Sequence, residues 1–126
     1  MDFSKLNTKI RADEGAFLHF RSPGTDTLIY DDGKAVGAWV RGRESKTVQA
    51  VVAQLGKQNM RSKEDRTNDV LAALVIKFEG VSRGDDPLQV TDEDLSWLIE
   101  QSSAFETQIV AFAQGLDNFL ASASKP

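Results

Sequence analysis

The sequence predicts an α+β fold, in which a small antiparallel sheet (a hairpin or three strands) is followed by a bundle of about four helices. Residues 15–42 are rich in β-branched and aromatic residues separated by turn signals, whereas later segments carry apolar residues at helical spacing. With 126 residues, of which 40% are hydrophobic, the chain is expected to be a single domain with a small core. We divide it into a β-rich part (1–42), a helical part (43–122) and a loose tail (123–126).

The N-terminal stretch, residues 1–14, is expected to form an arm. Phe3, Leu6 and Ile10 are spaced by three and four residues, which permits a short helix. Because isolated helices of about this length are marginal in water, we expect the arm to dock on the rest of the chain or to stay partly mobile.

Three strands are expected in the β-rich part, at residues 17–20, 27–30 and 35–40. Pro23 and Gly24 mark the first turn, since Pro fixes φ and Gly accepts positive φ. The Asp32-Gly33 pair between two apolar runs predicts a hairpin, for which it is the strongest short-range signal. In the third strand apolar residues alternate with others, which predicts one buried face and one partly open face.

The helical part begins with an amphipathic helix capped by Ser45. Its apolar stripe follows the i, i+3, i+4, i+7 pattern and consists of Val48, Val51, Val52 and Leu55. A central helix, around which the remainder is expected to pack, follows Ser62, runs to Phe78 and stops at Gly80. It contains the longest apolar run of the chain, with one broad face made of Val70, Leu71, Leu74, Val75 and Phe78.

Two further capped helices complete the predicted bundle. Thr91 and Asp94 have the spacing of a capping box, and Val90 and Leu95 stand where a hydrophobic staple requires apolar residues. Ser103 is expected to cap the last helix.

The last helix carries an apolar stripe whose residues step by four and three, the spacing of a coiled-coil seam. The stripe consists of Phe105, Ile109, Phe112, Leu116 and Phe119. Because it spans only about two heptads, two interpretations stay open: it packs into its own domain, or part of it meets another protomer or a client protein. We take these residues, together with the basic Arg61 and Arg66, as candidate partner-binding residues.

Charge is distributed unevenly along the chain. The formal net charge of -4 argues against nucleic acid as the main partner. A basic segment contains Arg41, Arg43, Lys46, Lys57, Arg61, Lys63 and Arg66. A later acidic segment contains Asp85, Asp86, Asp92, Glu93, Asp94, Glu100 and Glu106. These segments form either two solvated faces or an electrostatic surface for a partner or a second copy of the chain.

The residues that carry catalytic or metal chemistry are missing from the sequence. It has no cysteine, and His19 is its single histidine, so it offers no typical zinc site or thiol nucleophile. The turn at residues 31–33 lacks the ligand pattern of a calcium loop, and no glycine-rich phosphate loop follows a strand. We therefore expect an ordinary surface or edge histidine, no cofactor and no enzymatic activity, which leaves a binding or assembly role.

No membrane association is expected either. No apolar run reaches the roughly 18 residues of a membrane span. The N-terminal residues lack the basic-then-apolar layout of a signal peptide. Both observations favour a cytoplasmic protein.

From Asp31 onward the sequence resembles the tail assembly chaperones of long-tailed (siphovirus-type) bacteriophages and prophages. The positions that carry this resemblance are Leu71-Ala72-Ala73, Gly80-Val81, Pro87-Leu88, Thr91, Glu93-Asp94, Phe105, Gln108-Ile109 and Asn118-Phe119-Leu120. The β-rich start with Pro23-Gly24 and the Gly42-Arg43-Glu44-Ser45 step into a basic helix are also similar. The likeness covers most of the chain, as a shared layout with scattered positions.

This resemblance implies a function. Such chaperones act in the bacterial host cytoplasm, where they bind the helical tape-measure protein and keep it soluble while tail-tube subunits polymerise around it. It also implies a homo-oligomer, and a frameshift-extended form whose added domain recruits the tail-tube protein. The alternative is a permanent structural protein of the phage tail or head–tail junction, which would remain in the particle.

Overall fold

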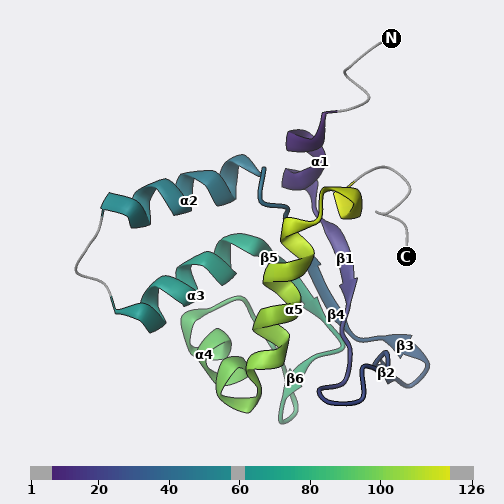
Figure 1. Ribbon diagram of the computed structural model, residues 1–126. Coiled ribbons are helices and arrows are strands. Elements are labelled where there is room, and N and C mark those ends of the chain that lie inside the picture. Colours follow the sequence, from purple (N-terminus) through teal and green to yellow (C-terminus); the bar gives the residue numbers. More distant parts are fainter. Residues whose placement is uncertain (1–6, 58–61, 120–126) are drawn as a thin grey trace.

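The computed structural model describes residues 7–57 and 62–119 and confirms the α+β class (Figure 1). Its elements are α1 (Thr8–Glu14), β1 (Ala16–His19), β2 (Tyr30–Asp31), β3 (Lys34–Ala35), β4 (Gly37–Val40), α2 (Lys46–Lys57), α3 (Lys63–Leu74), β5 (Val75–Glu79), β6 (Ser82–Arg83), β7 (Asp86–Pro87), α4 (Asp92–Gln101), α5 (Ser103–Gln114) and the 3-10 helix η2 (Leu116–Phe119). The expected tail, and Phe3 and Leu6 of the expected arm, lie outside the described residues. Ile10 lies in α1 and is exposed.

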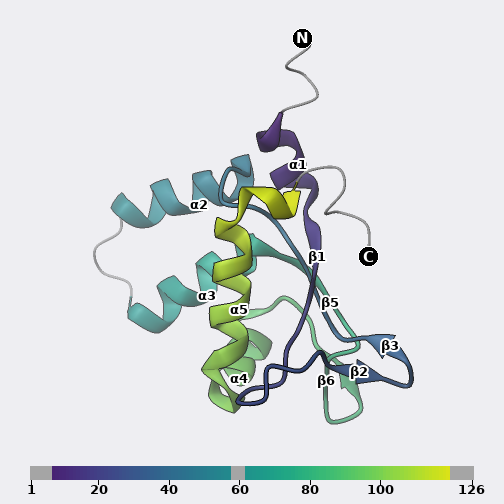
Figure 2. The same cartoon turned by 45° about the vertical axis from the view of Figure 1, so that its right-hand side comes forward.

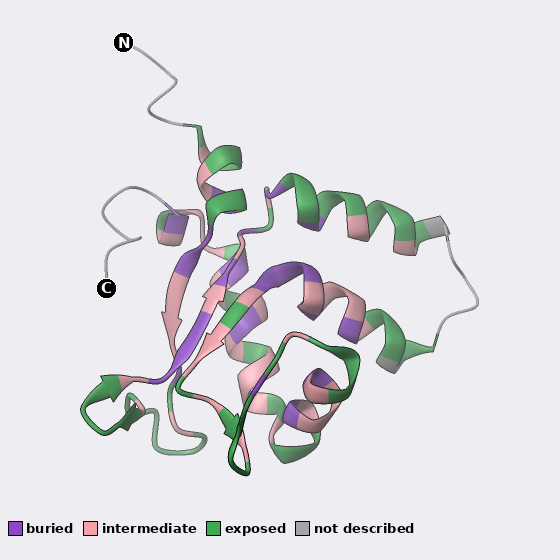
Figure 3. Cartoon of the chain, turned by 180° about the vertical axis from the view of Figure 1, so that it is seen from behind, coloured by how far each residue is buried: buried purple, intermediate pink, exposed green. Residues whose placement is uncertain are grey.

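The main sheet has three antiparallel strands in the order β1-β4-β5. Figure 2 shows α3 and α5 together on one side of this sheet, and Figure 3 shows the strands from the other side. Side chains alternate between the faces of a sheet, so Ala38 and Val40 are buried in the core while Trp39 points the opposite way. There the indole Nε1–H of Trp39 donates a hydrogen bond to Oε1 of Glu79, at 2.9 Å.

One hydrophobic core lies between the inner face of the sheet and helices α3, α4 and α5. Its buried members include Phe20, Ala38, Val40, Leu71, Leu74, Val75, Leu95 and Ile109. Burial of these side chains holds the layers together, because each fully buried aliphatic or aromatic side chain contributes about 1.5–3 kcal/mol.

The hairpin predicted at Asp32-Gly33 is confirmed by the pairing of β2 with β3. Both turn residues have positive φ, 52° and 76°, as a type I′ turn requires. The strand expected at residues 27–30 is shorter than predicted and lies outside the main sheet. His19 stands in the edge strand β1 and is half-buried, with Nε2 2.7 Å from the carbonyl oxygen of Ile29.

The central helix is shorter than predicted. It ends at Leu74 instead of Phe78, and the next five residues form β5. The helical prediction was wrong here because a run of Val, Ile and Phe suits a strand as well as a helix, and pairing with β4 decides between them. The third strand of the sheet therefore comes from the middle of the chain, and β structure is not confined to residues 1–42.

Most of the predicted helix starts are confirmed by hydrogen bonds. Ser45, Ser62 and Thr91 each accept a hydrogen bond through the side-chain oxygen from the backbone N–H three residues later. The cap of α5 is Ser102, one residue before the predicted Ser103, and it accepts from the N–H of Ala104 at 3.2 Å.

Candidate partner-binding groove

The apolar stripe predicted on the last helix is directed mainly into the chain itself. Ile109 and Phe119 are buried, with 0% and 2% of their surfaces exposed. The ring of Phe112 packs edge-on against that of Phe119, with centroids 5.5 Å apart, and the ring of Phe105 lies 5.1 Å from that of Phe20. Ile109 and Phe119 thus pack into their own domain, as the first of the two interpretations expects, whereas Phe105, Phe112 and Leu116 are half-buried.

The same stripe is not one continuous helix. Helix α5 ends at Gln114, and Leu116 and Phe119 belong to the 3-10 helix η2. The side-chain Nδ2 of Asn118 donates to the carbonyl oxygen of Phe112 at 2.8 Å, which satisfies an acceptor freed by the end of the helix. The coiled-coil seam expected over residues 105–119 is therefore corrected to a helix followed by a separate turn.

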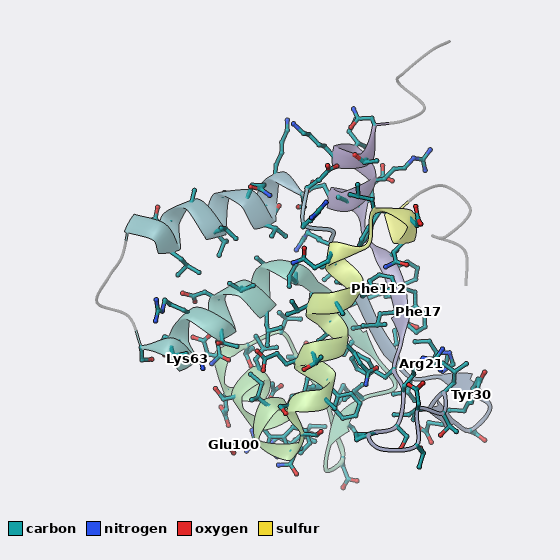
Figure 4. The ribbon with its side chains drawn as sticks, viewed as in Figure 1. Phe17, Arg21, Tyr30, Lys63, Glu100 and Phe112 are labelled. Carbon is teal, nitrogen blue, oxygen red and sulfur yellow. The ribbon has the colours of Figure 1, made fainter. Side chains whose placement is uncertain are left out.

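The structure describes one of the two basic residues predicted to bind a partner. Arg61 lies outside the described residues, whereas Arg66 lies on α3, is exposed and borders a groove between α3, α4 and α5. We call this feature the α3–α4–α5 groove. Figure 4 shows Lys63 at the start of α3 and Glu100 near the end of α4, on the same side of the molecule.

The α3–α4–α5 groove consists of two adjoining hollows of about 330 Å³ and 460 Å³. Both hollows are lined by Lys63, Thr67 and Glu106. The first is also lined by Arg66, Val70, Leu71 and Val110, and the second by Ser96, Ile99 and Glu100. Because three residues border both hollows, they form one groove rather than two separate sites.

The floor of the groove is apolar and partly open. Val70 and Val110 are half-buried and pack against the core from α3 and α5, and Ile99 does the same from α4. Leu71 lies deeper, with 1% of its surface exposed. Partly exposed aliphatic side chains at the base of a concave surface gain free energy when a partner covers them.

The two walls of the groove carry opposite charges. Lys63 and Arg66 stand on α3, whereas Glu100 and Glu106 come from α4 and α5. Within the part of the chain that the structure describes, none of these four side chains makes an ion pair or a hydrogen bond. Their charges are therefore available to a partner.

A hydrogen bond from a buried side chain of α3 links the α3 and α4 walls. Asn68 of α3 is 3% exposed, and its Nδ2 donates to Oγ of Ser96 on α4 at 2.7 Å. Its Oδ1 is buried and has no hydrogen-bond partner among the described residues. Such a buried polar contact is costly to break, so the α3 and α4 walls should keep their spacing.

The sequence did not single out this groove. Arg66 is a candidate partner-binding residue from the sequence alone, whereas Lys63, Glu100 and Glu106 stand out there only within the two charged segments, and Val70 and Leu71 only on an apolar face. The spacing of Lys63, Thr67, Val70 and Leu71, which places them on one side of a helix, was the available signal. The contributions of α4 and α5 depend on tertiary packing.

The groove combines an apolar floor with charges of both signs at its rim. In the described ranges, no group of three or more His, Cys, Asp or Glu residues could hold a metal ion. Across the same ranges, no helix is long and apolar enough to span a membrane. No protein-family model matches the chain, and no curated protein or solved structure is significantly similar to it.

Proposed function

We propose that this chain is a non-enzymatic phage tail assembly chaperone that binds the tape-measure protein in the bacterial host cytoplasm and keeps it soluble during tail-tube polymerisation. The proposal joins the sequence resemblance described above to one structural observation. That observation is the α3–α4–α5 groove, with its apolar floor and with rim charges that have no ion-pair partner among the described residues.

A groove of this kind suits a helical client. An amphipathic helix binds such a surface by placing apolar residues at i, i+3 or i+4, and i+7 into hollows along the groove. A long helical protein with exposed apolar stripes would aggregate, and covering each stripe would keep it soluble. Burial contributes about 25 cal/mol for each Å² of apolar surface removed from water.

The proposal changes which residues carry the binding. Arg66 remains a candidate and is joined by Lys63, Val70 and Val110. Ile109 and Phe119 are no longer candidates, because their side chains are already buried within the chain. Helix α5 thus uses one side to hold the fold and another side, with Glu106 and Val110, to line the groove.

The test is co-expression of the tagged chain with the tape-measure protein encoded by the same phage genome. We expect the tape-measure protein to become soluble and to co-purify with several copies of the chain. Val110→Glu, which places a charge on the groove floor, should lower the yield of complex about tenfold or more. Val52→Glu is the matched control, because Val52 lies on α2 outside the groove and is 49% exposed.

Circular dichroism and thermal melting should first show that both variants are folded. A tape-measure protein that neither binds the chain nor gains solubility would refute the chaperone proposal. Mass spectrometry of purified phage particles addresses the alternative, because only a permanent structural protein should be present there in stoichiometric amounts.

A further inference from the structure

We infer that the α3–α4–α5 groove is directional: it accepts an amphipathic helix with acidic residues on one flank of its apolar stripe and basic residues on the other, in a single N-to-C direction. This inference rests on the proposed function, since it concerns the same groove. It adds a property of the partner that a simple apolar groove would not require.

Charges of opposite sign lie on opposite walls of the groove. Lys63 and Arg66 lie on the α3 wall, and Glu100 and Glu106 lie on the opposite wall formed by α4 and α5. Lys63 and Glu106 border both hollows where these meet, so each hollow has a positive charge on one wall and a negative charge on the other.

The described part of the chain does not use these charges for its own stability. Among the described residues, the ion pairs of Arg83 engage Glu93 and Asp94, and that of Lys77 engages Glu79, but the four groove charges have no partner. Unpaired charges at the rim of a binding surface act mainly on orientation and specificity.

The geometry of a helix makes its direction in the groove matter. A helix that keeps its apolar stripe on the floor but is turned end for end exchanges its left and right flanks. A client with acidic residues on one flank and basic residues on the other therefore pairs with both walls in one direction. In the reverse direction it meets like charge on both walls.

The consequence concerns many copies on one client. If the helical segments of the tape-measure protein share one flank pattern, every bound copy of the chain faces the same way along it. The complex then has a polarity that the groove itself imposes, without any contact between copies.

The direction can be measured with a designed peptide as the probe. The peptide is an amphipathic helix of about 20 residues with leucines in one stripe, Glu along one flank and Lys along the other. It carries a spin label at its N-terminus. Single cysteines replace Gln101, at the end of α4, or Gln114, at the end of α5, in separate samples of the full chain. These are unique attachment sites because the sequence has no cysteine.

A fluorophore on each cysteine reports which end of the groove the peptide N-terminus approaches. We expect quenching of one fluorophore to exceed quenching of the other by about tenfold, since several rim charges change from attraction to repulsion on reversal. A second peptide with Glu and Lys exchanged should reverse the preference at similar affinity.

The decisive variant exchanges the charges of the walls: Lys63→Glu and Arg66→Glu combined with Glu100→Lys and Glu106→Lys. Its net charge is unchanged, and it should bind the first peptide in the opposite direction. The matched control replaces the same four residues by Gln and should bind the peptide in both directions about equally.

The outcomes separate the two proposals. If the peptide binds but its direction is the same in the wild type and in the exchanged variant, directionality is wrong and helix binding stands. If the peptide does not bind, or is displaced by a second copy of the chain occupying the groove, then neither directionality nor helix capture in this groove holds.

Discussion

Helices α2 and α3 have the same length and follow each other in the chain, yet they are buried very differently. Each has 12 residues and an amphipathic pattern. In α3, Leu71 and Leu74 are 1% and 4% exposed, whereas Val48 is the only buried residue among residues 46–56 of α2 and Val52 is 49% exposed. Helix α3 continues directly into β5 and packs on α2, α4 and α5, while α2 packs on α3 and reaches the core through Val48 and Val51 in its first two turns. The attachments of a helix, more than its pattern, decide how much of its stripe is buried.

The largest difference between α2 and α3 should be the loss of stability when one side chain of each helix is truncated. Leu71→Ala should lower the free energy of unfolding by about 2–5 kcal/mol, because it leaves a cavity beneath the groove. Val52→Ala on α2 should change it by less than about 0.5 kcal/mol, since Val52 is half in solvent. Urea unfolding followed by circular dichroism measures both. Similar losses in the two variants would mean that α2 is as firmly packed as α3.

Removal of the N-cap should destabilise the protein more at α2 than at α3, and the difference should be smaller than for the two truncations. Ser45 is completely buried, accepts from the N–H of Thr47 at 3.2 Å, and donates through Oγ to Oδ1 of Asp13 at 2.6 Å. Ser45→Ala should cost about 1–2 kcal/mol, because it removes the cap of α2 and also its link to α1. Ser62→Ala, at the exposed cap of α3, should cost about 0.5–1 kcal/mol. A larger loss at Ser62 than at Ser45 would contradict the view that α2 depends on its first turn.

The smallest effect should be a pH dependence of stability that arises where Asp13 of α1 contacts Ser45, the cap of α2. Hydrogen bonds from the hydroxyls of Ser45 and Thr47 lower the pKa of the Asp13 carboxyl below its ordinary value. The folded pKa is therefore below the unfolded one, which is about 3.9. The stabilisation is present above the unfolded pKa and is lost as the pH falls through the folded pKa.

The corresponding variant is Asp13→Asn. It should melt at a lower temperature than the wild type at pH 7, and the difference should shrink as the pH approaches 3. Thermal melts at a series of pH values provide the measurement, with Glu14→Gln as the neighbouring control. A constant difference between wild type and Asp13→Asn at all pH values would show that the carboxylate charge is not responsible.

The correctly predicted features were those encoded by neighbouring residues. The caps at Ser45, Ser62 and Thr91 and the hairpin at Asp32-Gly33 follow from residues within one turn of each other, so no tertiary contact is needed to recognise them. The last cap was misplaced by only one residue, from Ser102 to Ser103, because adjacent serines offer the same signal.

Features that depend on distant contacts were missed. The apolar run that contains Val75 and Phe78 fits both a helix and a strand, and its pairing with β4 depends on residues far away in the sequence. The groove could not be predicted for the same reason, since Lys63 and Glu100 become neighbours only when α3 and α4 pack together. The charge segments were visible, but not which of their members face each other.

The order of strands in the sheet has a consequence for how this protein is made. Strand β4 lies between β1 and β5, and β5 ends at Glu79. While the ribosome is still translating the preceding helices, Ala38 and Val40 have neither their second strand neighbour nor the helices that bury them. The first half of the chain must therefore wait with β4 unpaired on one side until residue 79 has emerged, and the inner face of the sheet stays uncovered until α4 and α5 have followed. A nascent chain stalled before that point would be a target for the chaperones and proteases of the cell.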